Sequence, residues 1–317
     1  MTFFNYTNST TQLPHPLTGT VSSFGGSSRL PRPQLGQSTS ELKVLSGLSS
    51  IASIIGIVGN VLVCFVVTKF RFLGRPKAEL FIVSLAVADL MVCIFAQPMY
   101  IIYLHGLLPK EVDLIRKAIT WVSTLVSVSH LFAISLERFF SLYFLHRFSV
   151  FVREHVIWNA ILLTWLIAIG FGAPSAVFRK ARIVSQYFVI AMLLVIPLVY
   201  AGIFYIVRLQ QRRINKQSVT KTFYTSQKSL TSERKIVYMI AVVVGVFYLC
   251  FTPLIIVPFF FSVKTTPAVR VNALRAFPWV NTIAFLNSSL NPYIYYWRSF
   301  RFRLALELIL RRIFEKK

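Results

Sequence analysis

The sequence has few acidic residues and few cysteines. Only 10 of its 317 residues are Asp or Glu, against 34 Lys and Arg, which gives a net charge of +24. Its three cysteines all lie in apolar stretches, which excludes a framework of extracellular disulfides. The sequence also lacks a paired acidic constellation and a metal-binding cluster of the HExxH type, so we expect no enzymatic activity.

Long apolar runs make up most of the chain and predict an all-α membrane protein. The sequence is 56% hydrophobic and 14% charged, with a mean hydropathy of +0.66, and a soluble domain of this length could not bury so much apolar surface. A helix needs about 20 apolar residues to cross ~30 Å of hydrocarbon. Seven runs meet this need, at residues 44–68, 79–104, 118–145, 156–178, 183–207, 236–263 and 271–297. The expected fold is a seven-transmembrane helix bundle.

The positive charges predict the orientation of the chain. Lys and Arg are concentrated after the first run and after the fifth, and the positive-inside rule makes both connections cytoplasmic. We therefore expect a disordered extracellular tail at 1–42, a membrane domain at 43–297, and an amphipathic helix with a short cytoplasmic tail at 298–317. Asn5 and Asn8 begin sequons that predict N-glycosylation of the outer tail. The basic charge is expected to meet anionic lipids rather than nucleic acid.

Polar residues interrupt several of the runs. A charged group inside a membrane helix costs at least ~2.5–3.5 kcal/mol on insertion scales, so it normally faces a protein interior and has a function there. Asp89 lies within the second run, and Glu137 and Arg138 lie near the end of the third. Because orphaned polar groups are costly in hydrocarbon, we expect further mid-membrane polar residues to converge with Asp89: Asn60, Ser127, Asn287, Ser288 and Asn291. His130 is interpreted mainly as an interior histidine, and a proton sensor is the alternative.

These residues belong to motifs that resemble those of the rhodopsin-type (class A) G protein-coupled receptors. The motifs are Gly59-Asn60, LAVADL at 85–90, SLERF at 135–139, Trp165, Pro197 with Tyr205, FYLCFTP at 247–253 and NSSLNPYIY at 287–295. The resemblance implies a plasma-membrane receptor that senses an extracellular ligand and activates heterotrimeric G proteins by opening its cytoplasmic face. Arrestin is a further partner to be considered, through the hydroxyl-rich loop 218–232.

The resemblance also implies roles for individual residues. It assigns a sodium site to Asp89, Ser127, Asn287, Ser288 and Asn291; the alternative is a structural hydrogen-bond network around a protonated Asp89. It assigns G protein coupling and switching to Glu137, Arg138, Tyr205, Glu233, Phe247, Phe251, Pro253, Pro292 and Tyr295. In this scheme Glu233 restrains Arg138, and Tyr205 and Tyr295 pack inward on opening. Glu233 can also be explained as an acid at a helix N-terminus. No cofactor is expected, because no lysine between Lys264 and Lys316 is available to bind retinal.

The resemblance places a mostly apolar ligand pocket in the outer half of the bundle. Its expected lining is Thr120, Trp121, Thr124, Val189, Ile190, Leu193, Phe251, Leu254, Ile255, Phe277, Asn281 and Phe285. Nine cations surround it: Lys110, Arg116, Lys117, Arg179, Lys180, Arg182, Lys264, Arg270 and Arg275. An apolar cavity under a basic rim predicts an amphiphilic anion, such as a lipid mediator, or a peptide; alternatively, the rim only meets lipid headgroups. Thr120 stands where amine receptors carry an aspartate, which argues against a biogenic amine.

Departures from the family pattern leave other interpretations open. Asp113 stands where the family usually has a cysteine, and Trp165 and Pro197 are close in sequence, so the second outer loop is expected to be very short and unbridged. Leu145 and His146 replace the frequent Pro-Leu of the second inner loop. A constitutively active or weakly coupling orphan receptor is therefore an alternative. A seven-span channel or transporter is a non-receptor alternative, although the sequence shows no internal repeats.

Overall fold

A computed structural model describes residues 37–69, 79–144, 154–215, 221–257, 260, 266–298 and parts of 302–311. The helices are α1 (Thr39–Lys69), α2 (Glu79–Met91), the π-helical η2 (Val92–Ala96), α3 (Gln97–Leu104), α4 (Lys110–Phe144), α6 (Glu154–Ser175), α7 (Arg179–Asn215), α8 (Lys221–Ile256) and α9 (Pro267–Arg298). Because α2, η2 and α3 are continuous, these residues form seven long helical segments, one for each predicted run. The predicted all-α seven-helix fold is confirmed.

The helix boundaries differ from the predicted runs where polar residues or prolines intervene. α1 begins at Thr39, so the end of the predicted tail 1–42 is helical. α8 ends at Ile256, before the predicted limit of 263, because Pro258 disfavours a helical conformation at the residue before it. The described parts of the C-terminal segment contain helical residues at 302–304 and 306–308, and Phe302 and Leu306 pack against Val66 of α1.

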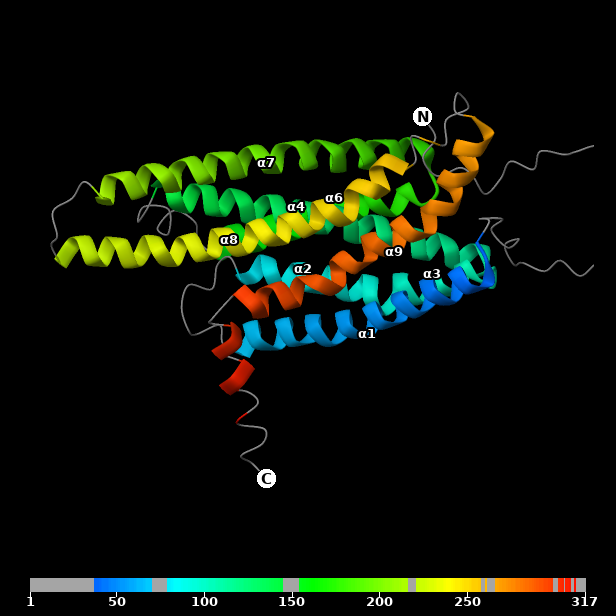
Figure 1. The fold of residues 1–317 in the computed structure, drawn as a ribbon, viewed down its shortest axis with the longest axis horizontal. Helices are drawn as coiled ribbons and strands as arrows, with labels where there is room; N and C mark the ends of the chain where they lie inside the picture. Colours follow the sequence, from blue (N-terminus) through cyan, green and yellow to red (C-terminus); the bar gives the residue numbers. More distant parts are fainter. Residues whose placement is uncertain are drawn as a thin grey trace, which may run out of the picture.

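The helices lie side by side in an elongated bundle (Figure 1), in which α7 and α8 extend beyond the others at the left-hand end. Among the described residues, five helical segments are long and apolar enough to cross a membrane, and α8 contributes a shorter apolar segment, Ile240–Ile256. α9 is more polar, but many of its polar side chains are buried inside the bundle. Large apolar side chains instead cover outward faces; Leu198 is 71% exposed and Leu249 is 75% exposed.

Glycines allow two pairs of helices to touch closely. A Cβ atom on Gly172 of α6 would lie 2.8 Å from the backbone nitrogen of Val122 in α4. A Cβ on Gly59 of α1 would lie 2.8 Å from the Cβ of Pro292 in α9. Both distances are shorter than real contacts, so only glycine fits without displacement of the neighbouring helix. The first approach brings α6 and α4 together, and the second brings α1 and α9 together next to the polar residues Asn60 and Asn291.

The π-helical turn η2 is supported by a side chain of α1. Its widened geometry directs the backbone N–H of Gln97 to the carbonyl of Val92, whereas a regular α-helix would direct it to the carbonyl of Cys93. Ser53 Oγ donates a 2.6 Å hydrogen bond to the Cys93 carbonyl. The Cys93 carbonyl, which the wide turn deprives of its usual helical donor, therefore accepts a hydrogen bond from α1 instead.

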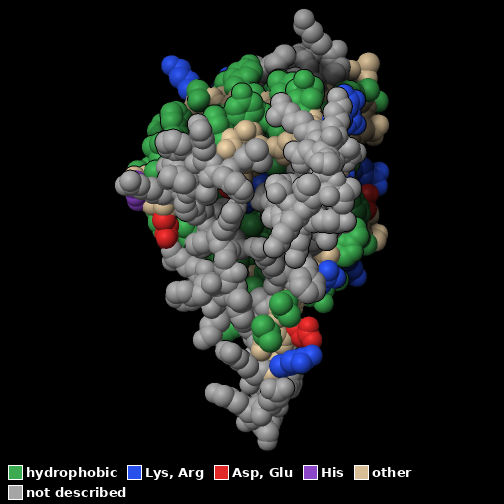
Figure 2. Space-filling model, turned by 90° about the vertical axis from the view of Figure 1, so that its left-hand side faces the viewer, with side chains coloured by type: hydrophobic (Ala, Val, Ile, Leu, Met, Phe, Trp, Pro, Cys, Tyr) green, Lys and Arg blue, Asp and Glu red, His purple; other side chains and the backbone are tan. Residues whose placement is uncertain are grey.

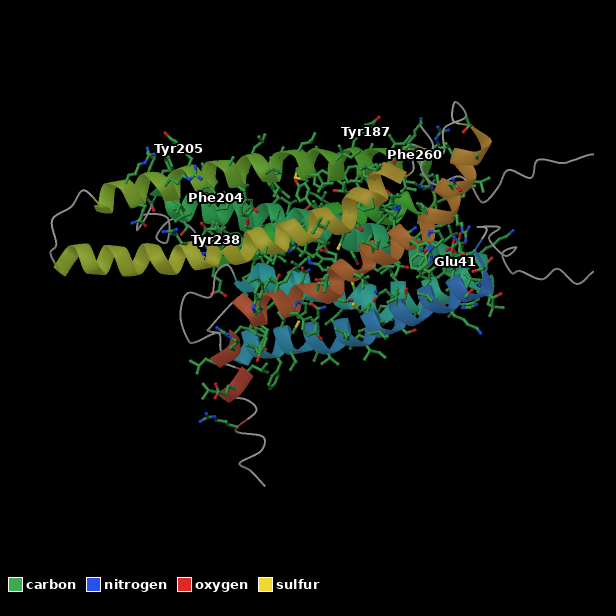
Figure 3. The ribbon with its side chains drawn as sticks, viewed as in Figure 1. Glu41, Tyr187, Phe204, Tyr205, Tyr238 and Phe260 are labelled. Carbon is green, nitrogen blue, oxygen red and sulfur yellow. The ribbon has the colours of Figure 1, made fainter. Side chains whose placement is uncertain are left out.

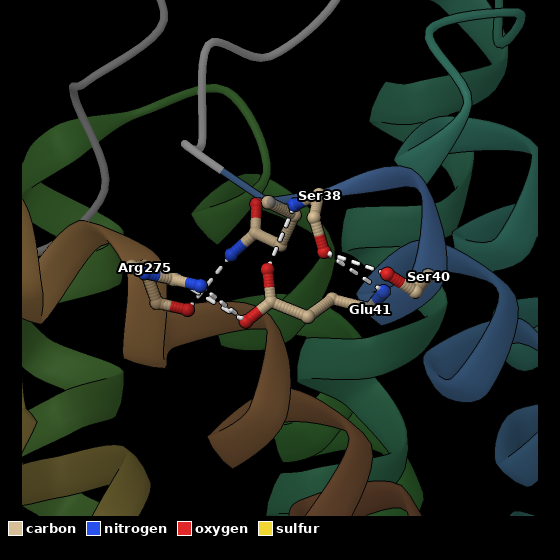
Figure 4. Close-up of polar contacts among 5 residues, drawn as sticks. Ser38, Ser40, Glu41 and Arg275 are labelled. Atoms are coloured by element: carbon tan, nitrogen blue, oxygen red, sulfur yellow. Dashed lines mark hydrogen bonds and ion pairs between the residues drawn. The ribbon is translucent and has the colours of Figure 1, made fainter.

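Polar contacts hold the predicted extracellular ends of α1 and α9 together (Figure 4). The backbone N–H of Ser38 donates to Glu41 Oε2 at 2.7 Å, and Glu41 N donates back to Ser38 Oγ at 3.2 Å, as in a capping box. Arg275 of α9 donates to Glu41 Oε1 at 2.9 Å. Gln37 Nε2 also donates to the Arg275 carbonyl at 2.7 Å. The start of α1 is thereby joined to the outer part of α9.

Candidate functional site

The polar residues of three predicted spans meet inside the bundle. Asp89 of α2 is fully buried, and Asn291 Nδ2 of α9 donates to its Oδ2 at 2.9 Å. Asn60 Nδ2 of α1 donates to the Ser288 carbonyl at 2.9 Å. Ser127 of α4 is also buried, at 4% exposure. The contacts between α1, α2 and α9 are those expected from the sequence.

Several buried oxygen atoms of this cluster have no protein partner. They are Asp89 Oδ1, Asn60 Oδ1, Asn287 Oδ1 and Asn291 Oδ1, each without a hydrogen bond in the structure. All four are acceptors, and carboxylate and amide oxygens are the ligands that hard cations prefer. The residues present therefore fit the sodium ion that the resemblance implies. A cation held there would balance the Asp89 charge and engage these acceptors.

His130 and Trp165 connect the centre of the bundle to neighbouring helices. His130 is fully buried; its Nδ1 lies 2.8 Å from the Val126 carbonyl, and its ring meets Phe81 edge-on at 5.7 Å. This environment agrees with the interpretation as an interior histidine. Trp165 Nε1 of α6 donates to Ser84 Oγ of α2 at 2.9 Å. α6 is thus joined to α2 through a side-chain hydrogen bond.

Arg138 lies near the end of α4 that the positive charges assign to the cytoplasm. Its Nε is 2.7 Å from Glu137 Oε2, and both side chains are largely buried. The side chain of Glu233, which the resemblance places within reach of Arg138, lies outside the described residues. The ion pair with Glu137 is therefore a contact that restrains the Arg138 side chain in this structure.

Tyr200 and Tyr205 of α7 face different surroundings in this structure. Tyr205, which the resemblance implies packs inward on opening, is 65% exposed and points away from the bundle (Figure 3). Tyr200, also on α7, is buried, and its hydroxyl has no hydrogen-bond partner among the described residues. Buried positions recur along α7 at Ile196, Tyr200, Ile203 and Val207. This helical spacing is the sequence signal that identifies Tyr200 as the inward tyrosine in this conformation.

Aromatic residues pack in α8 just before its proline. Phe247 is fully buried, and its ring stacks on that of Phe251 with centroids 4.4 Å apart. Pro253 lies within the same helix and Pro292 within α9, where each removes a backbone hydrogen bond. Tyr295, one turn after Pro292, is 5% exposed. These predicted switch residues are thus placed in the interior, next to points where helices can bend.

The predicted ligand-lining residues fall into two groups. Val189, Leu193 and Phe251 belong to the main buried cluster, and Leu254 and Ile255 pack against it. Phe285 instead belongs to a second cluster and packs edge-on against Tyr100 at 5.2 Å. Phe285 thus packs in a different buried cluster from these five residues.

The few polar groups of this lining bond within their own helices. Thr120 Oγ1 donates to the Arg116 carbonyl and Thr124 Oγ1 to the Thr120 carbonyl, each at 2.8 Å. Asn281 Nδ2 donates to the Phe277 carbonyl at 3.0 Å. Each hydroxyl therefore uses its donor locally, although its oxygen can still accept. The polar lining offers a ligand mainly acceptor atoms.

Many cations of the predicted rim are engaged by the protein itself. Arg116 contacts Asp113 through Nε at 2.8 Å and Nη2 at 2.6 Å, and Lys117 Nζ contacts the other carboxylate oxygen at 2.8 Å. Arg275 pairs with Glu41, and Arg182 Nε donates to the Ser175 carbonyl at 2.9 Å. The remaining described rim cations, Lys110, Arg179 and Lys180, are exposed. The side chains of Lys264 and Arg270 lie outside the described residues.

Asp113 forms the centre of a cluster that sequence reasoning did not identify. It is 3% exposed, at the position where the resemblance expected a cysteine. The guanidinium of Arg116 lies 4.8 Å from the ring centroid of Tyr103 and 5.6 Å from that of Tyr100, both on α3. Such cation–π contacts are attractive. Electrostatic contacts therefore join the outer end of α4 to α3 at this position.

The connection between α6 and α7 is as short as the sequence predicted. α6 ends at Ser175 and α7 begins at Arg179. Ser175 Oγ lies 3.0 Å from Ser185 Oγ, which ties the two helix ends together. The second outer loop is therefore too short to form a lid over the outer half of the bundle.

Comparison with known proteins defines the class to which this bundle belongs. The family described as 7 transmembrane receptor (rhodopsin family) matches residues 59–295. The chain belongs to this family. It is therefore a multi-pass membrane receptor of class A that signals through G proteins, and its family confirms the prediction that it is not an enzyme.

Individual receptors of known name share about a quarter of their aligned residues with the chain, at 25–26% identity. A D(5)-like dopamine receptor of Takifugu rubripes is 26% identical, over 85% of this chain and 67% of the relative. Trace amine-associated receptor 13c of Danio rerio is 25% identical, over 83% of this chain and 85% of the relative. Growth hormone secretagogue receptor type 1 of Oryctolagus cuniculus is 25% identical, over 80% of this chain and 76% of the relative. The names of these receptors refer to different ligands, so they do not specify a ligand for this chain.

Proposed function

We propose that this receptor lies in the plasma membrane, with its N-terminus outside and its C-terminus inside, and recognises an amphiphilic anion such as a lipid mediator. A peptide with an acidic group is the second candidate. The observation that carries the proposal is the environment of the acidic residues at the outer ends of the helices. Asp113 is buried and neutralised by Arg116 and Lys117, and Glu41 is paired with Arg275.

This arrangement disfavours a cationic ligand despite the similarity to dopamine and trace-amine receptors. A buried ammonium group needs a carboxylate partner. Among the described residues at these outer ends, Glu111 is exposed, while Asp113 and Glu41 already have basic partners. Arg179 and Lys180, by contrast, are exposed at the start of α7 and follow the short second outer loop. An anionic headgroup would meet these two cations, while its apolar body meets Val189 and Leu193 further along α7.

We further propose how the ligand signal reaches the G protein. Asp89, Ser127, Asn287, Ser288 and Asn291 hold a sodium ion that supplies positive charge in the resting state. Release of Arg138 from Glu137 and movement of α8 about Pro253 then open the cytoplasmic face. Switching fully between closed and open populations needs about 5.5 kcal/mol of differential binding. The ligand and the G protein supply this difference together.

The proposal is tested by second-messenger measurements across the main G protein pathways in cells at matched surface expression. Lysophosphatidic acid and oleic acid serve as anionic probes, dopamine as the cationic probe and an acidic peptide as the fourth. We expect an anionic probe to raise the output of the wild type but not of Arg138→Ala.

Two further variants test the site of anion recognition. The double variant Arg179→Ala/Lys180→Ala should weaken the response to the anion, whereas Lys43→Ala, exposed on α1, should not. A response to dopamine alone would reject the anionic ligand. Output that is equal with and without every probe, and abolished by Arg138→Ala, would instead support the constitutively active receptor.

A further inference from the structure

A hollow of about 360 Å³ lies between α7 and α8, near the ends by which these helices extend beyond the rest of the bundle. Figure 3 shows Phe204 and Tyr238 on neighbouring parts of these two helices, and their ring centroids are 5.8 Å apart. The hollow combines apolar or aromatic side chains with hydrogen-bond donors: Phe204, Val207, Tyr238, Arg208, Gln211 and Arg234.

The hollow lies at the boundary between apolar and polar parts of both helices. The candidate membrane span of α7 continues to Arg212, and the apolar segment of α8 begins at Ile240. Arg208 and Arg234 are therefore at the level where lipid headgroups meet the protein. Phe204 lies about one helical turn deeper than Arg208 along α7. The polar side of the hollow thus faces the headgroup region, and its aromatic side faces the upper part of the acyl chains.

The electrostatics of the hollow favour an anion. The described ion pairs involve neither Arg208 nor Arg234. Arg234 Nη1 donates to Gln211 Oε1 at 3.1 Å, a contact that crosses from α8 to α7 and holds this guanidinium beside the hollow. Arg208, which also lines the hollow, is exposed. Figure 2 shows lysine and arginine side chains at several points of this end of the molecule.

We propose that this hollow binds the phosphate group of an anionic phospholipid from the inner leaflet. A phosphomonoester presents several oxygens that two guanidinium groups can engage with paired hydrogen bonds. The lysine- and arginine-rich connections assign this end to the cytoplasm, where anionic lipids are concentrated. Phe204, Val207 and Tyr238 contact the glycerol and the first methylene groups. The site is separate from the extracellular ligand pocket and does not depend on which ligand binds there.

The location gives the bound lipid a defined consequence. Arg208 belongs to α7 and Arg234 to α8, so one phosphate that engages both arginines restrains the distance between these helices. Movement of α8 would separate the two guanidinium groups. The lipid therefore stabilises the spacing seen in this structure and raises the thermal stability of the receptor.

Purified receptor in detergent micelles tests the proposal by native mass spectrometry and thermal unfolding. The probes are phosphatidic acid and phosphatidylcholine, with glycerol phosphate as the headgroup without acyl chains. We expect preferential binding and stabilisation by phosphatidic acid. Arg208→Ala and Arg234→Ala should each weaken this binding about tenfold, because one charge-assisted hydrogen bond is lost.

Arg212→Ala is the matched control, since Arg212 is exposed on the same helix but does not line the hollow. Each variant is compared with itself in phosphatidylcholine, so a general loss of stability does not affect the result. Equal weakening in Arg212→Ala would show diffuse attraction to basic charge and overturn the site. Equal binding of glycerol phosphate would overturn a lipid occupant, and unchanged binding in both hollow variants would overturn the proposal entirely.

Discussion

Replacement of Asp113 by alanine provides a direct test of the electrostatic cluster at the outer end of α4. The substitution removes a carboxylate that contacts Arg116 at 2.6 and 2.8 Å and Lys117 at 2.8 Å. The Lys117 side chain is 26% exposed and can be rehydrated, but that of Arg116 is only 10% exposed. Removal of one partner of a buried ion pair costs about 3–5 kcal/mol. We take the lower end, about 3 kcal/mol, because the tyrosine rings still contact the guanidinium.

The expected loss is measured by thermal unfolding of the purified receptor. Cys93 and Cys250 are free and buried, so a thiol-reactive fluorophore reports their exposure as the bundle unfolds. A loss of this size corresponds to a fall in melting temperature of roughly 6–12 °C, at about 2–4 °C per kcal/mol. Glu111→Ala, which removes an exposed acid from the same helical turn, is the control.

A double variant separates loss of charge pairing from loss of packing. In Asp113→Ala/Arg116→Met the buried guanidinium is absent, so part of the stability should return. If Asp113→Ala melts within about 1 °C of Glu111→Ala, the cluster contributes little and the reasoning fails. If the double variant is less stable than the single one, packing rather than charge explains the effect.

Three further predictions concern the interior. In thermal unfolding, sodium chloride should stabilise the wild type more than choline chloride does, and Asp89→Asn should abolish this difference. An equal sodium effect in the variant would contradict the ion site. Tyr200→Ala should lower the free energy of unfolding by about 3 kcal/mol, because the residue is only 6% exposed, whereas Tyr205→Ala, at 65% exposure, should cost less than about 1 kcal/mol; equal losses in thermal unfolding would contradict the inward position of Tyr200. Gly172→Val should destabilise by about 1–3 kcal/mol in thermal unfolding, because its side chain meets the α4 backbone. Gly170→Val, with nothing within 4 Å of its Cβ, is the control, and equal losses would contradict the close contact.

The apolar runs and the central polar residues were predictable because each has a strong physical constraint. A membrane-spanning helix must be long and apolar, which locates seven helices from sequence alone. Asp89 and Asn291 are so costly in hydrocarbon that they have to find partners, and the structure joins them. Helix ends are less constrained, and α1 and α4 both begin before the apolar runs that predicted them.

The orientation of residues around each helix was harder to predict. The resemblance implies that Tyr205 packs inward on opening, and in this structure Tyr205 is exposed while Tyr200 is the buried tyrosine of α7. The two positions are about 140° apart on a helix of 3.6 residues per turn, so they face different surroundings. A motif specifies a position along the chain, whereas the burial pattern specifies which side chain faces the interior in a given conformation.

The count of rim cations likewise did not reveal which charges are available to a ligand. Arg116 and Arg275 carry the same formal charge. Arg116 is buried against Asp113 and two tyrosines, whereas the Arg275 side chain is 54% exposed beside Glu41. Exposed ion pairs contribute little and are screened by salt, while a buried pair is costly to break. The α4 end is therefore fixed, and the α1–α9 contact is the one that can open at small cost. A charged ligand that approaches this surface can displace Arg275 from Glu41 much more easily than Arg116 from Asp113.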